Sequence, residues 1–61
     1  MVGIKFKAQS GNIFEWIVIS EHSMFSDTWE CYALNKYVPG EALREPFMQH
    51  FSTDFINKNK F

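Results

Sequence analysis

The sequence predicts an all-β domain, a small barrel of four or five antiparallel strands that ends in a short helical turn. Short runs of apolar residues with strand-forming composition follow one another along the chain, and turn-forming residues separate them. With 61 residues the chain holds one domain, spanning residues 1–61. An open sheet of that size would expose both of its edges, and closure into a barrel removes them.

The first two strands are expected on either side of a tight turn. In residues 3–8 apolar side chains alternate with Lys5 and Lys7, which is the pattern of a half-buried strand. Residues 9–12 contain Gly and Asn, which tolerate the positive φ of a tight turn. Residues 13–20 are rich in β-branched and aromatic side chains on both faces. We therefore expect a long central strand that bends and contributes to two sides of the barrel.

A third strand is expected after a polar loop at residues 21–28. Residues 29–36 alternate again, with Trp29, Cys31 and Ala33 on one face. The core expected from these patterns consists of Ile4, Phe6, Phe14, Ile17, Ile19, Cys31, Ala33, Phe51 and Phe55.

The remaining third of the chain predicts a turn, a strand and a helical end. Pro39-Gly40 has the pattern of a type II turn. Residues 41–45 fit a helical turn or the start of a fourth strand equally well. A sheet capped by one helix over residues 40–46 is the alternative fold. Residues 47–51 alternate as a strand. Residues 52–54 can cap a helix, in which Phe55-Ile56 would plug the core.

This order of elements resembles the SH3-like small barrel. The resemblance rests on residues 3–8, 11–16, 29–32 and 51–56. The chain also resembles short SH3-like proteins encoded by bacteriophages and other mobile elements, which implies an accessory protein that binds a host protein in the host cytoplasm and could inhibit it. The Ala-Leu-Tyr-Asp-Tyr and Pro-Ser-Asn-Tyr motifs of Src-homology-3 domains are missing, so binding of proline-rich peptides does not carry over.

Composition narrows the function classes. Six basic against seven acidic residues give a net charge of −1, which argues against a mainly electrostatic nucleic-acid binder and against an acidic mimic of DNA. An aromatic content of 18% argues against disorder. Seven Phe, two Trp and two Tyr are more than so small a core easily hides. Exposed aromatic residues favour a protein surface as the partner.

Compartment and membrane association follow from two features. The lone cysteine, Cys31, allows no internal disulfide and fits a reducing cytoplasm. The longest apolar run, residues 16–19, is far shorter than the ~20 residues of a membrane helix. We expect a cytoplasmic protein without a secretory signal.

The most suggestive candidate site is the loop that carries Met24 and Phe25. A plain connector would be polar at its middle, whereas this loop places two large apolar side chains there, flanked by Glu21 and Asp27. One interpretation is that the pair anchors a protein partner while the two carboxylates set the electrostatics. The other is that Phe25 folds back as a lid over the open end of the barrel.

The alternative function is nucleic-acid binding by a small barrel. Its phosphate contacts would come from four lysines near the two ends of the chain: Lys5, Lys7, Lys58 and Lys60. Trp16 or Tyr32 would stack on bases. The same lysines also fit the role of guarding edge strands against aggregation.

Two further constellations are weak. His22, Cys31 and His50 lack the close spacing of zinc ligands, so no metal or cofactor is expected. Ser23, His22 and Asp27 supply the residue types of a hydrolase, but a domain this small rarely offers the water-excluding pocket that catalysis needs. We expect no enzymatic activity.

Self-association is left open. A domain with few stabilising devices could form a homodimer, with the strand at residues 47–51 as its seam, or remain a monomer that associates only on its target.

Overall fold

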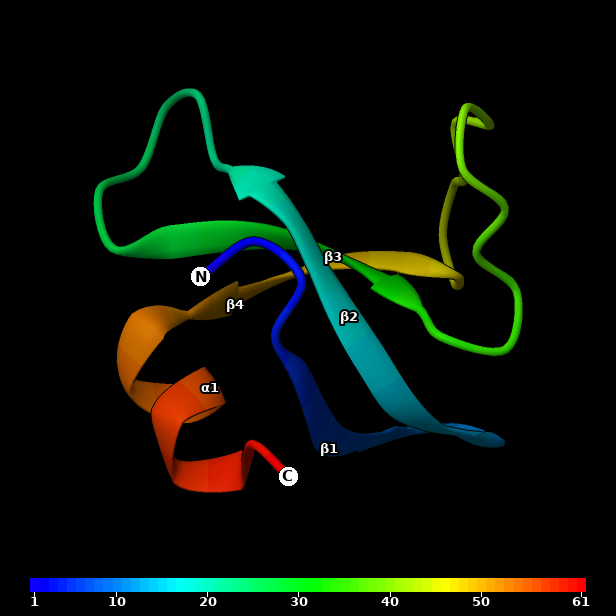
Figure 1. The fold of residues 1–61 in the computed structure, drawn as a ribbon, viewed down its shortest axis with the longest axis horizontal. Coiled ribbons are helices and arrows are strands. Elements are labelled where there is room, and N and C mark those ends of the chain that lie inside the picture. The colour runs from blue at the N-terminus through cyan, green and yellow to red at the C-terminus, as the bar shows by residue number, and fades with distance from the viewer.

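The chain folds into one curled antiparallel sheet and a short C-terminal helix. The computed structural model describes residues 1–61. Its elements are β1 (Lys5–Ser10), β2 (Ile13–Glu21), β3 (Thr28–Ala33), β4 (Met48–Ser52) and α1 (Thr53–Asn59). The strands follow one another in space in the order β1-β2-β3-β4, and the sheet bends into a half-barrel with α1 beside it (Figure 1). The expectation of a mostly β fold with a short helical end is confirmed.

Two turns have the backbone that their residues predict. Gly11 connects β1 and β2 with a φ of 60°. Gly40 has a φ of 91°, and the Glu41 amide donates to the Val38 carbonyl at 3.0 Å. Positive φ at the residue after Pro39 is what a type II turn requires, so that prediction is confirmed.

Two irregularities in the pairing help the sheet to curl. β1 holds one extra residue between Lys7 and Ser10, and β2 holds one between Val18 and Ser20. Extra residues of this kind bend a strand and increase its twist. The predicted bending of the central strand therefore has a local cause.

The core lies on the inner face of the half-barrel. Its buried members are Phe6, Ile13, Trp16, Val18, Cys31, Ala33 and Ile56. Trp16 is 0% exposed, and its indole N–H donates to the Ala8 carbonyl at 2.8 Å. A buried indole needs such a partner, because an unpaired N–H in an apolar core is costly.

The helix α1 fills the space between the two outer strands. Ser52 Oγ accepts from the Phe55 amide at 3.1 Å and caps the helix, as predicted from the sequence. Ile56 is fully buried, and the Phe55 ring stacks on Phe51 at 5.3 Å. Beyond α1, Lys60 pairs with Phe6 of β1 in an antiparallel bridge. The C-terminal segment thus lies along the free edge of β1.

Several core predictions were wrong, and most of the errors fall in β2. Phe14 is 56% exposed, and Ile17 lies on the outer face beside Lys5, whereas Trp16 and Val18 are buried. An almost wholly apolar strand offers no alternation from which the inner face could be identified. Phe55 is also partly exposed, and its neighbour Ile56 is the residue that is buried instead.

The long connection between β3 and β4 is irregular. Residues 41–45 form neither a helical turn nor a strand, so both expectations for this segment were wrong, as was the alternative of a capping helix there. Tyr37 packs its ring against Tyr32 on the outer face, with ring centroids 5.6 Å apart. This contact explains why Tyr32 is largely buried on a face that the alternation predicts to be solvated.

The chain has no helix long and apolar enough to cross a membrane.

Candidate functional site

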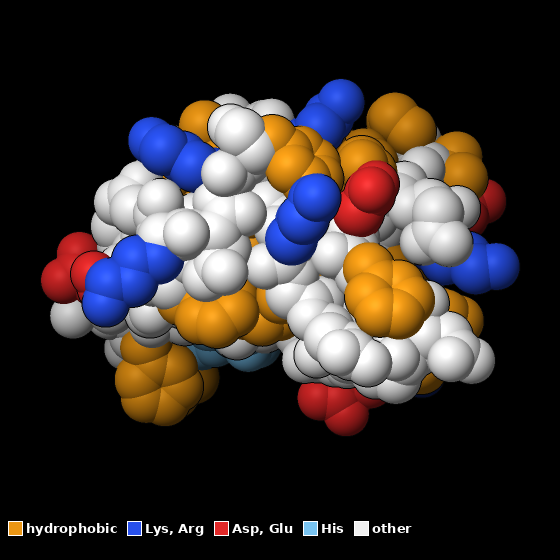
Figure 2. Space-filling view, turned by 90° about the horizontal axis from the view of Figure 1, so that it is seen from below, with side chains coloured by type: hydrophobic (Ala, Val, Ile, Leu, Met, Phe, Trp, Pro, Cys, Tyr) orange, Lys and Arg blue, Asp and Glu red, His pale blue; other side chains and the backbone are white.

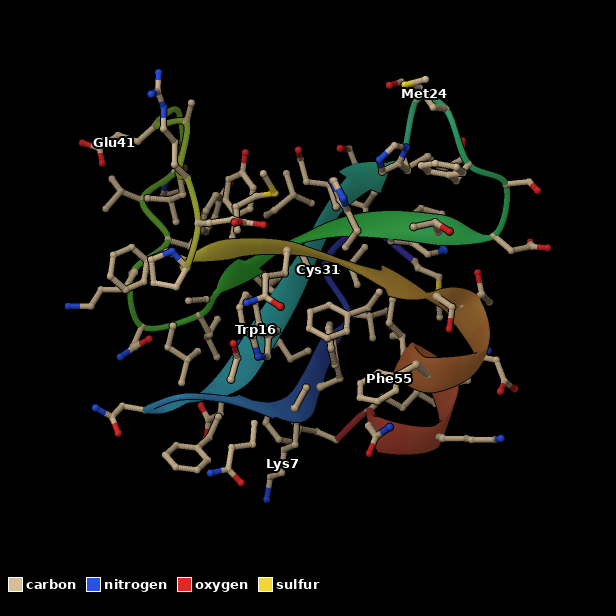
Figure 3. The ribbon with its side chains drawn as sticks, turned by 180° about the vertical axis from the view of Figure 1, so that it is seen from behind. Lys7, Trp16, Met24, Cys31, Glu41 and Phe55 are labelled. Carbon is tan, nitrogen blue, oxygen red and sulfur yellow. The ribbon has the colours of Figure 1, made fainter.

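The loop at residues 22–27, which joins β2 to β3, presents two large apolar side chains to solvent. Met24 is 82% exposed and Phe25 is 63% exposed. Figure 3 shows Met24 at the outer tip of the loop, far from Trp16 in the core. The mostly exposed Phe25 ring packs against His22 of the same loop, so it does not cover the open end of the barrel as a lid.

A single side chain holds the backbone of this loop in place. The Met24 and Phe25 amides both donate to His22 Nδ1, at 3.0 and 3.2 Å. The His22 amide in turn donates to the Thr28 carbonyl at 2.9 Å and closes the base of the loop. Asp27 completes the turn with a φ of 53°, a conformation that Asp tolerates better than most residues.

The far end of the loop is tied to the start of α1. The Thr53 amide donates to the Asp27 carbonyl at 2.8 Å, and Thr53 Oγ1 donates to the same oxygen at 3.3 Å. Thr53 Oγ1 also accepts from the Trp29 indole N–H at 2.7 Å. One hydroxyl therefore connects the loop, β3 and α1.

Three aromatic rings continue from the loop to the outer face of the sheet. The Phe25 ring lies 4.9 Å from the His22 ring, which lies 4.2 Å from the His50 ring of β4. These centroid separations are those of packed aromatic pairs. Phe25 is thus held against the outside of the domain, with part of its ring still free.

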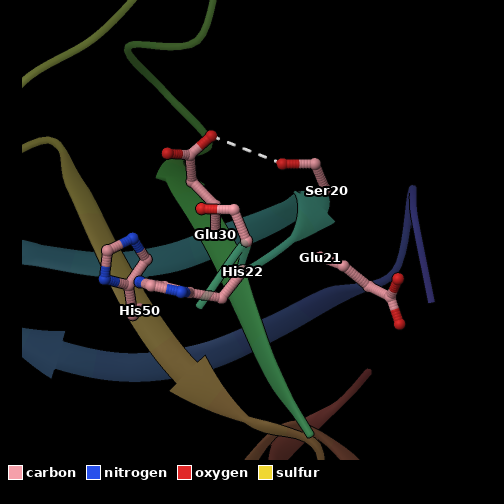
Figure 4. A pocket seen from close by; sticks show the side chains of 6 residues that line it. Ser20, Glu21, His22, Glu30 and His50 are labelled. Carbon is pink, nitrogen blue, oxygen red and sulfur yellow. Dashed lines mark hydrogen bonds between the residues drawn. The ribbon is translucent and has the colours of Figure 1, made fainter. Parts of the chain in front are cut away.

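A polar hollow lies next to the apolar tip (Figure 4). It has a volume of about 270 Å³ and is lined by Ser20, Glu21, His22, Ser23, Glu30 and His50. Ser20 Oγ donates to Glu30 Oε2 at 3.4 Å. The carboxylates of Glu21 and Glu30 therefore lie on one side of the loop tip formed by Met24 and Phe25. Asp27 lies at the other end of the loop.

The serine, histidine and aspartate of this loop are not arranged as a hydrolase triad. In such a triad the histidine donates from Nδ1 to a carboxylate and accepts the serine proton at Nε2. Here Nδ1 of His22 is an acceptor for two backbone amides. That role leaves no Nδ1–H to orient the ring on Asp27.

The residues weighed as metal ligands are only partly brought together. His22 and His50 meet edge to face, with their ring centroids 4.2 Å apart. Cys31 lies on the opposite, inner face, where burial raises the pKa of its thiol to about 12. No group of three or more His, Cys, Asp or Glu side chains is placed to hold a metal ion.

The four terminal lysines form no single patch. Lys60 does lie beside β1, but Lys58 forms an ion pair with Asp54 at 3.0 Å. Lys7 lies over the Phe61 ring at 5.4 Å. Figure 2, which shows the molecule from the side of β1 and α1, has basic side chains scattered over the surface with acidic ones between them.

Neither aromatic residue expected to stack on bases is available for it. Trp16 is fully enclosed in the core, and Tyr32 is covered by Tyr37. This part of the nucleic-acid expectation is corrected, because base stacking needs an exposed ring face.

Comparisons with protein-family models, curated proteins and solved structures give no significant match to this chain. The resemblance to SH3-like proteins of mobile elements therefore gains no support from relatives. The functional argument depends on the geometry of the loop at residues 22–27 and the hollow beside it.

Glu30 was not found from the sequence as a contributor to this site, and His50 was considered there only as a metal ligand. Glu30 and His50 reach the hollow because β3 and β4 pair them directly, and His50 lies 28 positions after His22 in the chain. The sequence did contain one local signal for the shape of the loop, which is His22. A side chain that accepts hydrogen bonds can bind the backbone amides two and three residues later, as Asn and Asp do in turns.

Proposed function

We propose that this protein is a non-catalytic protein-binding module whose anchors are Met24 and Phe25. The observation that carries the proposal is that two large apolar side chains stand exposed on a loop that is tethered at both ends. A flexible loop would lose conformational entropy on binding. A tethered loop has already lost much of it, so more of the contact energy remains as affinity.

The charges around the loop indicate the chemistry of the partner. Glu21, Asp27 and Glu30 surround an apolar tip. A complementary surface has an apolar pocket for Met24 and Phe25, with Lys or Arg at its rim. Rim charges of this kind mainly steer association and select the partner, while the buried anchors supply most of the affinity.

The first test replaces both anchors and measures stability and binding separately. Because Met24 and Phe25 lie outside the core, the double variant Met24→Ala/Phe25→Ala should keep the wild-type melting temperature. Binding to a partner isolated by cross-linking and quantified by calorimetry should weaken by at least about 2 kcal/mol.

A matched control exists at the other end of the molecule. Phe14 is a similarly exposed phenylalanine near the β1–β2 turn, opposite the loop at residues 22–27 (Figure 1). Phe14→Ala should leave binding unchanged. A clear fall in melting temperature for the double variant, or an equal loss of binding for Phe14→Ala, would contradict the proposal.

The identity of the partner as a host protein, its inhibition and a mobile-element origin depend on the resemblance alone and stay predictions. We also propose the SH3-like assignment of the half-barrel. Its support is the antiparallel bridge from Phe6 to Lys60, which lies where a fifth strand would pair with the first to close the barrel.

Nucleic-acid binding is the second candidate, and one observation favours it. The C-terminal segment runs beside β1, where the Phe61 amide donates to the Lys5 carbonyl at 3.1 Å, and this brings Lys60 near Lys5 and Lys7. With three lysines that form no ion pair, the logarithm of affinity for a single strand would fall with log salt at a slope of about −2. The absence of any gel shift at low salt would remove this candidate.

A further inference from the structure

The protonation state of His22 is fixed by the contacts of its ring. Both groups that meet Nδ1, the Met24 and Phe25 amides, are donors, at 3.0 and 3.2 Å. Nδ1 must therefore carry a lone pair, and the ring proton is on Nε2. A neutral imidazole can do this, because it has one donor and one acceptor nitrogen.

A protonated His22 cannot hold the loop in the same way. In the imidazolium form both ring nitrogens are donors. The Met24 and Phe25 amides would then face an N–H instead of a lone pair, and both hydrogen bonds would be lost together. The loop keeps its ties at its two ends, so the loss is confined to the tip.

Charged and titratable groups from each neighbouring element surround the ring. Glu21 at the end of β2 and Glu30 of β3 line the same hollow as His22. The ring of His50 of β4 lies 4.2 Å from that of His22. Asp27 lies at the far end of the loop, and the uncharged Phe25 ring lies 4.9 Å from that of His22.

We propose that His22 is a pH-sensitive latch, which holds Met24 and Phe25 in place while its ring is neutral and releases them when the ring binds a proton. The release is a property of the isolated chain. Its consequence for binding depends on the function proposed above: acid would weaken the complex because the anchors are no longer preorganised.

The release can be measured in the isolated protein by NMR between pH 7.5 and pH 5. At pH 7.5 we expect a nuclear Overhauser contact between the Phe25 and His22 rings, and rigid amides at Met24 and Phe25. As the His22 ring titrates, the contact should disappear and both amides should become mobile on the ps–ns timescale. Amides in β3 should stay rigid throughout.

Substitutions at His22 separate its acceptor role from its ring. His22→Asn places a non-titrating oxygen where it can accept the same two amides, as asparagine does in turns, so the loop should stay rigid at both pH values. His22→Phe keeps the ring and removes the acceptor, so the loop should be mobile at both. His50→Gln keeps the latch and should retain the pH-dependent release.

Three results would overturn the latch. One is a loop that stays rigid with its Phe25–His22 contact at pH 5 although the His22 ring has titrated. Another is a ring that stays neutral down to pH 5. The third is the same pH-dependent release in His22→Asn as in the wild type.

A binding measurement tells failure of the latch from failure of the proposed function. One linked proton makes the association constant for the partner fall by up to about tenfold per pH unit below the titration of His22, and not at all in His22→Asn. If the release occurs but the anchor variants bind as the wild type does, the latch stands and the proposed anchors are wrong. If the anchors are right and binding has the same pH dependence in wild type and His22→Asn, the latch is wrong.

Discussion

The thiol of Cys31 is shielded from solvent. Its side chain lies in the core, with Sγ 3.5 Å from the Trp29 carbonyl oxygen. Burial raises the pKa of its thiol to about 12, because the thiolate would have to form in apolar surroundings. Burial and the charge of Glu30 also raise the pKa of Tyr32. Both groups therefore hold their protons more tightly in the folded state than in the unfolded chain.

This difference predicts that the protein loses stability in alkali. The unfolded chain releases the thiol proton near its usual pKa of about 8.5, whereas the folded chain keeps it until about pH 12. The contribution of these two groups to the free energy of unfolding should therefore be constant below about pH 8 and fall above it. In urea titrations Cys31→Ala should show a smaller fall, while Tyr32 still contributes. A variant with the wild-type alkaline slope would contradict the assignment to Cys31.

At the scale of the element, α1 depends on the residue that precedes it, Ser52. The helix has only seven residues, and a helix so short is unstable without packing and a cap. Packing comes from Ile56 and Phe55 against the sheet. The cap comes from Ser52 Oγ, which binds the Phe55 amide.

Ser52→Ala should therefore lower the free energy of unfolding by about 1 kcal/mol. The measurement is the urea midpoint at constant slope. Ser26→Ala is the matched control, because Ser26 is exposed and its hydroxyl makes no hydrogen bond in the structure, so its midpoint should not move. Equal effects of the two substitutions would show that the cap contributes nothing.

The elements also show what could be predicted from the sequence. The sequence correctly predicts which face of β3 points to the core, because Trp29, Cys31 and Ala33 alternate strictly. It also predicts the type II turn at Pro39-Gly40, because a turn of this type depends on neighbouring residues alone. The inner face of β2 was not assigned correctly, because both of its faces are apolar. The anchors of the candidate site stand out within their own loop, but the contact of His22 with His50 arises from strand pairing, which no local pattern reveals.

For the whole molecule, the two outer edges of the sheet are not equally free. The C-terminal residues Lys60 and Phe61 lie along β1. On the other side, Phe51 of β4 packs on Phe6 and Trp16 with ring centroids 5.1 and 5.3 Å apart, and Phe47 packs against the same core. The two phenylalanines of the expected dimer seam are thus packed within the monomer, which leaves the backbone edge and the exposed His50.

We therefore expect the isolated protein to be a monomer. Light scattering at two concentrations a hundredfold apart should give a mass near 7.2 kDa at both. A mass of about twice that value at the higher concentration would restore the homodimer, with the backbone of β4 as its seam.

The hydroxyl of Thr53 connects the loop at residues 22–27 to the start of α1. It accepts from Trp29 and donates to Asp27, so a methyl group in its place would leave the Trp29 indole N–H unpaired and the Asp27 carbonyl with the Thr53 amide alone. Among the natural residues only serine offers a similarly short group with both a donor and an acceptor. A partner that displaces the loop would therefore also displace the start of α1. A chain in which α1 no longer packs on the sheet would lose the shape of its loop as well.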